Sequence, residues 1–128
     1  MKGQSFINAL MPIWIIQIVL DTVQQSIGTD EITFYTNFML ILSNLVLPIV
    51  AGARVVRRGG SIGMAIAGAL SISLVSIFIV AIGFTLKSAG IEAIAGYIIA
   101  TIMFSVVPQI VFGVIGGYFG KKLYAKST

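Results

Sequence analysis

The 128-residue chain contains no cysteine and no histidine. Their absence excludes disulfides and thiol chemistry, and it removes the side chains that most often bind transition metals. It also leaves the four acidic residues without a histidine or cysteine partner, so no base–nucleophile pair can be assembled. We therefore expect a protein that is not an enzyme and that uses no cofactor.

Charge is scarce as well. Charged residues make up 9% of the chain, against ~25% in an average soluble domain, so the chain cannot cover a water-facing surface. Four stretches carry no charge at all: Gly3–Leu20, Ile32–Ala53, Ile62–Leu86 and Ala93–Gly120. A helix needs ~20 apolar residues to cross a bilayer. The sequence predicts an all-α polytopic membrane protein, with one transmembrane domain over residues 1–128 and four spans at about 5–25, 32–53, 62–86 and 93–120.

The two signs of charge are separated along the chain. The acidic residues and one lysine lie at the connections after the first and third spans: Asp21, Asp30, Glu31, Lys87 and Glu92. The other basic residues lie at the remaining span ends: Lys2, Arg54, Arg57, Arg58, Lys121, Lys122 and Lys126. Basic loops stay on the cytoplasmic side, so this pattern predicts two hairpins with both termini in the cytoplasm.

The basic span ends have a second consequence. Arg54, Arg57, Arg58, Lys121 and Lys122 are expected to fix the topology and to contact lipid headgroups. Because these residues are few and are confined to span ends, the net charge of +4 does not indicate nucleic acid as a partner.

Small residues recur at helical spacing in the last two spans. They form two strings, Gly63-Ala67-Ser71 and Gly113, Gly116, Gly117 and Gly120. Such residues let helix backbones approach closely, either within one chain or between subunits, and the sequence leaves both arrangements open. A further small face at Ala93, Gly96 and Ala100 points away from the second string unless Pro108 kinks the helix.

Polar residues within the spans suggest a membrane-embedded site. Gln17, Asp21, Asn37 and Asn44 form the candidate set. Asp21 is interpreted either as an ion or proton site or, preferably, as an interfacial carboxylate that ends the first span. Asn37, Asn44, Ser105 and Gln109 could line a polar path or, more often in membranes, hydrogen-bond between helices. Tyr97 is interpreted as a span residue or interface anchor.

Three segments resemble a known group of proteins. They are Ala51-Gly52-Ala53-Arg54, the turn Arg57-Arg58-Gly59-Gly60 with Gly63 and Gly68 after it, and the closing Gly113-Val114-Ile115-Gly116-Gly117. Together they resemble small four-helix prokaryotic membrane proteins of unknown function, with an Ala-Gly-Arg-like turn and a C-terminal Gly-x-x-Gly-Gly string. The resemblance implies the same topology in the cytoplasmic membrane of a prokaryote and implies no activity.

These features lead to one main hypothesis and its alternatives. The abundant small faces favour a non-enzymatic membrane protein that acts by helix–helix association, as a homo-oligomer or as an accessory subunit, with lipids and other membrane subunits as partners. The polar face around Gln17 and Asp21 favours instead an oligomeric channel or transporter of a small solute or ion. The small size and the lysine-rich tail leave a holin-like pore former as a third possibility.

Overall fold

The computed structural model describes residues 2–26, 32–87 and 90–127, and these residues are almost entirely helical. The elements are α1 (Gly3–Ser26), α2 (Ile32–Ile41), the π-helical turn η1 (Leu42–Val46), α3 (Leu47–Arg57), α4 (Ile62–Leu86) and α5 (Ile91–Ser127). Because α2, η1 and α3 follow one another without a break, they form one rod. The described residues therefore contain four helices long and apolar enough to cross a membrane. The predicted fold class is confirmed.

The two largest differences between the helix ends and the predicted spans are at the ends of α3 and α5. The second rod continues to Arg57, four residues past its predicted end, and α5 continues to Ser127. Both extensions contain basic residues, because a helix does not have to end where its apolar stretch ends. The connection at 27–31, which contains Asp30 and Glu31, lies outside the described residues.

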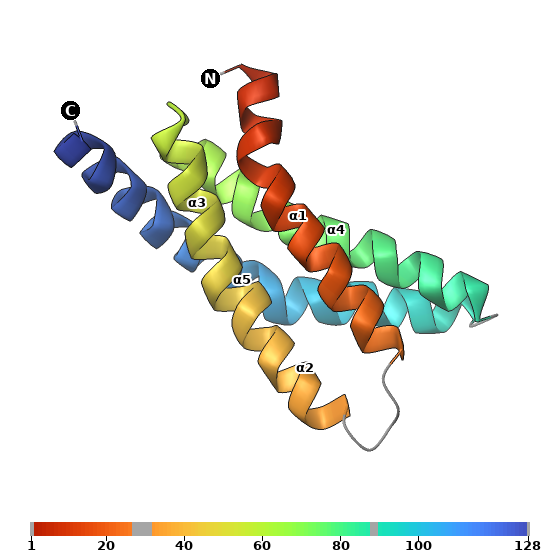
Figure 1. The fold of residues 1–128 in the computed structure, drawn as a ribbon. Helices are drawn as coiled ribbons and strands as arrows, with labels where there is room; N and C mark the ends of the chain where they lie inside the picture. Colours follow the sequence, from red (N-terminus) through yellow and green to blue (C-terminus); the bar gives the residue numbers. More distant parts are fainter. Residues whose placement is uncertain (1, 27–31, 88–89, 128) are drawn as a thin grey trace.

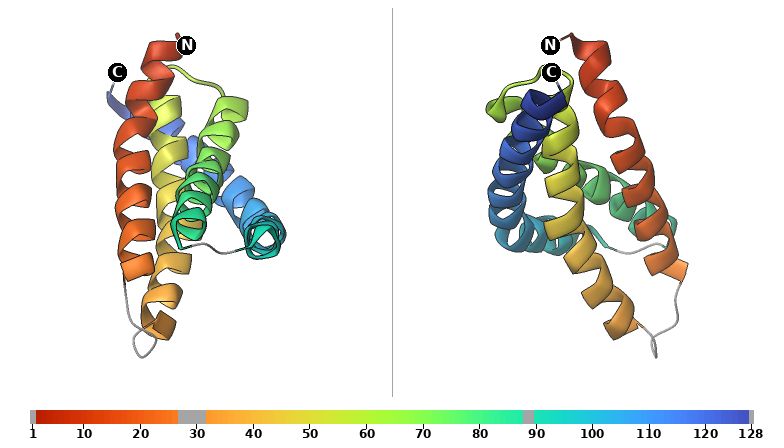
Figure 2. Two further views of the ribbon diagram at one scale, coloured as in Figure 1. Left: turned by 90° about the vertical axis from the view of Figure 1, so that its right-hand side faces the viewer. Right: turned by 60° about the vertical axis from the view of Figure 1, so that its left-hand side comes forward.

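The helices share one end of the molecule and diverge toward the other. The start of α1, the end of α3, the start of α4 and the end of α5 all lie at the same end (Figures 1 and 2). Toward the opposite end, α2 separates from the first half of α5 (Figure 1). Helices α3 and α4 both pack against α5 and against α1, so they form the centre of the bundle.

The core between α1, α3 and α4 is small and apolar. Leu10, Val55 and Ile72 are completely buried there. Arg54 lies at the edge of this core, where its Nε donates a hydrogen bond to the Ala9 carbonyl oxygen at 2.7 Å. Arg54 is thus half-buried and ties α3 to α1, whereas Arg57 and Arg58 are exposed.

Glycines determine how closely α5 packs. A Cβ atom added to Gly116 would lie 2.7 Å from the Ile49 Cα, and one added to Gly120 would lie 2.8 Å from the Ala53 Cα. On the side of α4, a Cβ at Gly113 would lie 2.7 Å from the Ala69 Cβ. Gly117 is buried between α3 and α4 in the same way. The structure therefore places all four glycines of the second string at contacts within the chain.

The first string of small residues has a different environment. Gly63 and Ala67 are exposed on α4, and the atom closest to a Cβ at Gly63 is the Ser61 Oγ, at 3.7 Å. Ser71 is half-buried, and its Oγ accepts a hydrogen bond from Trp14 Nε1 at 2.8 Å. Among the described residues, no atom of another helix lies within 4 Å of a Cβ added to Gly63, and Ala67 is exposed.

Helix α5 changes direction part-way along, so its two halves have different neighbours (Figure 1). Pro108 lies inside the helix and cannot donate the backbone hydrogen bond of a regular α-helix. Beyond it, the glycines contact α3 and α4; before it, Tyr97 contacts α4, with its ring 6.1 Å from that of Phe84. The small face at Ala93, Gly96 and Ala100 is exposed.

Candidate membrane-embedded binding site

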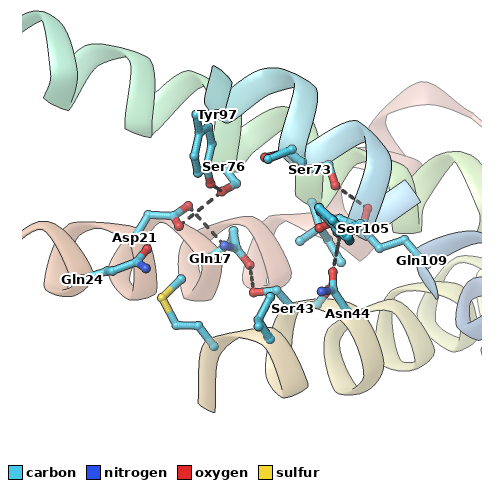
Figure 3. Close-up of a pocket in the computed structure, with 16 residues that line it drawn as sticks. Gln17, Asp21, Gln24, Ser43, Asn44, Ser73, Ser76, Tyr97, Ser105 and Gln109 are labelled. Atoms are coloured by element: carbon cyan, nitrogen blue, oxygen red, sulfur yellow. Dashed lines mark hydrogen bonds between the residues drawn. The ribbon is translucent and has the colours of Figure 1, made fainter. Parts of the chain in front are cut away.

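A partly open cavity of about 220 Å³ lies where α2 and the first half of α5 diverge (Figure 3). Helices α1 and α4 supply its inner wall. The polar residues of the lining are Gln17, Asp21, Gln24, Ser43, Asn44, Ser73, Ser76, Tyr97, Thr101, Ser105 and Gln109. The apolar residues are Met39, Leu40, Ile72, Ala100 and Phe104. This many polar side chains inside a transmembrane bundle point to a functional site.

Asp21 is the charged group of this cavity. Its side chain is 0% exposed, and α1 continues past it to Ser26. Gln17 Nε2 donates to Asp21 Oδ2 at 3.1 Å, and Ser76 Oγ donates to Oδ1 at 3.2 Å. Asp21 is therefore enclosed by the bundle before the end of α1, and the interpretation of this residue as an interfacial carboxylate stays a prediction. Because Gln17 and Asp21 are four residues apart on one face, the helix presents both of them to the bundle.

Tyr97 extends the hydrogen-bonded chain to α5. Its hydroxyl lies 2.7 Å from Ser76 Oγ. When Ser76 donates to Asp21, the tyrosine hydroxyl is the donor to Ser76. Three helices, α1, α4 and α5, are therefore joined at the carboxylate, as the dashed lines in Figure 3 show.

A second group of hydrogen bonds centres on Gln109, which is buried on α5. Ser73 Oγ donates to Gln109 Oε1 at 2.5 Å. Gln109 Nε2 in turn lies 3.3 Å from the Ser43 carbonyl oxygen and 3.4 Å from Asn44 Oδ1. Ser43 Oγ donates to Gln17 Oε1 at 2.8 Å, which connects this group to the one around Asp21.

The π-helical turn makes one of these contacts possible. Pro48 has no N–H, and its ring would clash with the carbonyl group of Asn44, four residues earlier, in a regular α-helix. The backbone responds with a wider turn, in which Leu47 N–H donates to the Leu42 carbonyl oxygen, five residues back. In a regular α-helix the Leu47 N–H would donate to the Ser43 carbonyl oxygen. Here that oxygen is free to accept a hydrogen bond from Gln109.

The structure brings together some of the predicted polar residues and not others. Gln17, Asp21 and Asn44 line the cavity, whereas Asn37 is exposed and is not part of the lining. The hydroxyls of Ser73 and Ser76 were not predicted as site residues, because serines on a membrane helix are also small packing residues. Tyr97, interpreted from the sequence as a span residue or interface anchor, lines the cavity, and its hydroxyl contacts Ser76 Oγ.

Charge balance is the unusual property of the site. Every buried side-chain nitrogen or oxygen atom in the described residues has a hydrogen-bond partner. Yet no lysine or arginine is among the described residues that line the cavity. The carboxylate is therefore solvated by neutral dipoles but is not neutralised by a protein cation. Such a group can hold a proton or a cationic ligand, and the cavity provides the space for one.

No protein-family model matches this chain, and neither a curated protein nor a solved structure matches it. The chemistry of the cavity is therefore the basis for a functional assignment.

Proposed function

We propose that this integral membrane protein binds a small solute in the cavity at Asp21 and moves it across the bilayer, as a non-enzymatic transporter or channel. The observation that carries this proposal is the buried carboxylate of Asp21 at the wall of an open cavity. A charged side chain deep in a membrane protein costs at least ~2.5–3.5 kcal/mol, so it is retained where it contacts a substrate or an ion. The many polar groups beside it support a solute path.

Transport by the purified, full-length protein in lipid vesicles tests the proposal. Glycerol, urea and n-butylammonium chloride serve as probes, and their entry is followed by the swelling of the vesicles. We expect at least one probe to enter faster than in protein-free vesicles, and we expect Asp21→Asn to lower that rate about tenfold or more. Asparagine preserves the shape of the side chain and removes its charge.

Glu92→Gln is the matched control. It removes the same charge, but Glu92 is exposed at the start of α5 and does not line the cavity. We expect this variant to transport like the original protein. Equal rates for Asp21→Asn and the original protein, or no entry above that of protein-free vesicles, would contradict the proposed function.

Orientation in the membrane forms part of the proposal. We place both termini in the cytoplasm of a prokaryotic cell. The exposed basic residues Arg57, Arg58, Lys121 and Lys122 support this orientation, because they lie at the helix ends gathered on one side of the molecule (Figure 2). The exposed ends of α4 and α5 on the other side contain Lys87 and Glu92. Because basic residues stay on the cytoplasmic side, this charge difference favours the end of the molecule that contains Arg57 and Arg58 as the cytoplasmic end.

Helix association, as a homo-oligomer or an accessory subunit, is the second candidate. The observation that favours it is the exposure of Gly63 and Ala67 on one face of α4, where the Ser61 Oγ, at 3.7 Å, is the one atom that an added Cβ at Gly63 would contact among the described residues. A helix of another subunit could approach this face closely. Association and transport are compatible, because this face and the cavity use different residues.

A further inference from the structure

We infer that the cavity takes a small organic cation, a protonated amine with an apolar body, whose ammonium group pairs with Asp21. This inference rests on the proposed function and specifies the substrate class of the same site. It follows from the charge of the cavity, from the distribution of its polar groups and from its opening.

An ionised Asp21 is balanced by one monovalent cation. Asp21 is the only acidic residue among the described residues that line the cavity, and no basic residue lines it. One carboxylate neutralises one positive charge. A divalent ion would leave an unbalanced charge in a medium of low dielectric constant, which is costly. A neutral solute would leave an ionised carboxylate without a counter-ion and would therefore bind beside the protonated form of Asp21.

The positions of the polar groups favour an organic cation over an alkali ion. An alkali ion needs several oxygen atoms that converge on one point. Here the oxygen atoms extend along the cavity from Asp21, Ser76 and Tyr97 at one end to Asn44 and Gln109 at the other, joined through the Ser43–Gln17 hydrogen bond (Figure 3). Apolar residues such as Ile72 and Met39 complete the lining. This pattern suits a ligand with a charged end, an apolar body and, at its other end, space for a hydrogen-bonding group.

Asp21 has spare hydrogen-bonding capacity for an ammonium ion, which can reach the carboxylate once a neighbouring side chain shifts, because Asp21 is 0% exposed in the structure. Each carboxylate oxygen accepts one hydrogen bond, from Gln17 or from Ser76, and each has further lone pairs. The three N–H donors of an ammonium group can use these lone pairs and the hydroxyl oxygen of Tyr97, which lies beside Ser76. Hydrogen bonds between two charged groups are among the strongest in proteins.

The opening of the cavity fits the same ligand. Leu40 and Phe104 line the cavity but are 48% and 70% exposed, so they form its rim, whereas Asp21 and Gln109 lie inside. Both rim residues belong to membrane-spanning helices, so an amphiphilic amine could enter from the lipid with its apolar body against the rim. The aromatic ring of Phe104 can also stabilise a passing cation.

Calorimetric titration of the full-length protein in lipid nanodiscs tests this inference. The probes are n-butylammonium, its neutral analogue n-butanol, and Na⁺. We expect n-butylammonium to bind at least about tenfold more tightly than n-butanol, because only the cation pairs with the carboxylate. Asp21→Asn should remove this difference and leave the affinity for n-butanol unchanged. Glu92→Gln should retain the difference. Circular dichroism confirms that both variants are folded.

Three results would overturn the inference. The first is equal affinity for n-butylammonium and n-butanol, and the second is an n-butylammonium affinity that does not change in Asp21→Asn. The third is displacement of n-butylammonium by Na⁺ at a lower concentration than is needed with n-butanol. If glycerol or urea still enters vesicles in a manner that depends on Asp21, the proposed transport function stands and only the substrate class is wrong. If no probe binds and none enters, both proposals fail.

Discussion

Gly116 and Ala67 are both small residues in membrane-spanning helices, yet their surroundings are opposite. A Cβ atom at Gly116 would lie 2.7 Å from the Ile49 Cα, whereas Ala67 is exposed. We expect Gly116→Leu to destabilise the folded chain by about 3 kcal/mol or more, because overpacking against a backbone that cannot yield forces the two helices apart. Ala67→Leu should leave the thermal unfolding temperature nearly unchanged. Thermal unfolding in detergent measures both.

The Ala67→Leu variant also tests whether subunits associate through α4. If the exposed face of α4 joins subunits, native mass spectrometry should show oligomers of the original protein that Ala67→Leu converts to folded monomers. Oligomers that persist in Ala67→Leu would exclude this face. An unaltered unfolding temperature for Gly116→Leu would contradict the close packing of α5 against α3.

Several lining residues, Asn44 and Gln109 among them, could be named from the sequence, but contacts between site residues could be predicted only where the sequence pattern is local. Gln17 and Asp21 share a helical face, so their proximity follows from their spacing. The contact of Gln109 with Ser73 and that of Tyr97 with Ser76 join α5 to α4, and these depend on how the helices pack. Asn37 shows that local spacing can also mislead. It lies seven residues before Asn44, on the same helical face, and yet it is exposed and does not line the cavity.

Whole elements were more predictable than contacts, because span length and charge follow directly from the physics of the bilayer. The four apolar segments predicted the four membrane-length helices. The turn η1 was not predicted, although Pro48 is visible in the sequence. A proline can be accommodated by a kink, a helix end or a wider turn. Here the wider turn leaves the Ser43 carbonyl oxygen free, and Gln109 donates a hydrogen bond to it. This contact between helices cannot be read from the sequence around Pro48.

The bend of α5 can be tested as a property of the element. Because the chain has no native cysteine, spin labels can be attached specifically at Ile91→Cys and Leu123→Cys, both exposed positions. In a straight α-helix their backbones would be about 48 Å apart. We expect a shorter distance in the original protein and an increase of several Å, roughly, in Pro108→Ala, which restores the missing hydrogen bond.

Pro12→Ala is the control for that measurement, because Pro12 lies in α1 and should not alter a distance within α5. An unchanged distance in Pro108→Ala would mean that the contacts of the α5 glycines with α3 and α4 are sufficient to hold the bend.

At the scale of the whole molecule, two asymmetries coincide. The end where the helices gather contains most of the exposed basic residues, and the cavity lies where α2 and the first half of α5 diverge toward the opposite end (Figures 1 and 2). If basic ends stay in the cytoplasm, the divergence opens toward the outer leaflet. The orientation therefore determines the leaflet from which a ligand can reach Asp21, and a measurement of topology is also a measurement of access.

Labelling of single cysteines tests this orientation. Leu86→Cys at the end of α4 and Leu123→Cys near the end of α5 are matched, because both replace exposed leucines and neither changes a charge. The assay uses spheroplasts, in which the outer layers of the bacterial cell are removed and the cytoplasmic membrane is intact. In these cells we expect a membrane-impermeant maleimide to label Leu86→Cys without permeabilisation. Leu123→Cys should react only after the membrane is permeabilised. The reverse pattern would place the basic ends outside and would turn the opening of the cavity toward the cytoplasmic leaflet. Labelling of both positions before permeabilisation would mean that the two ends of the bundle do not lie on opposite sides of one membrane.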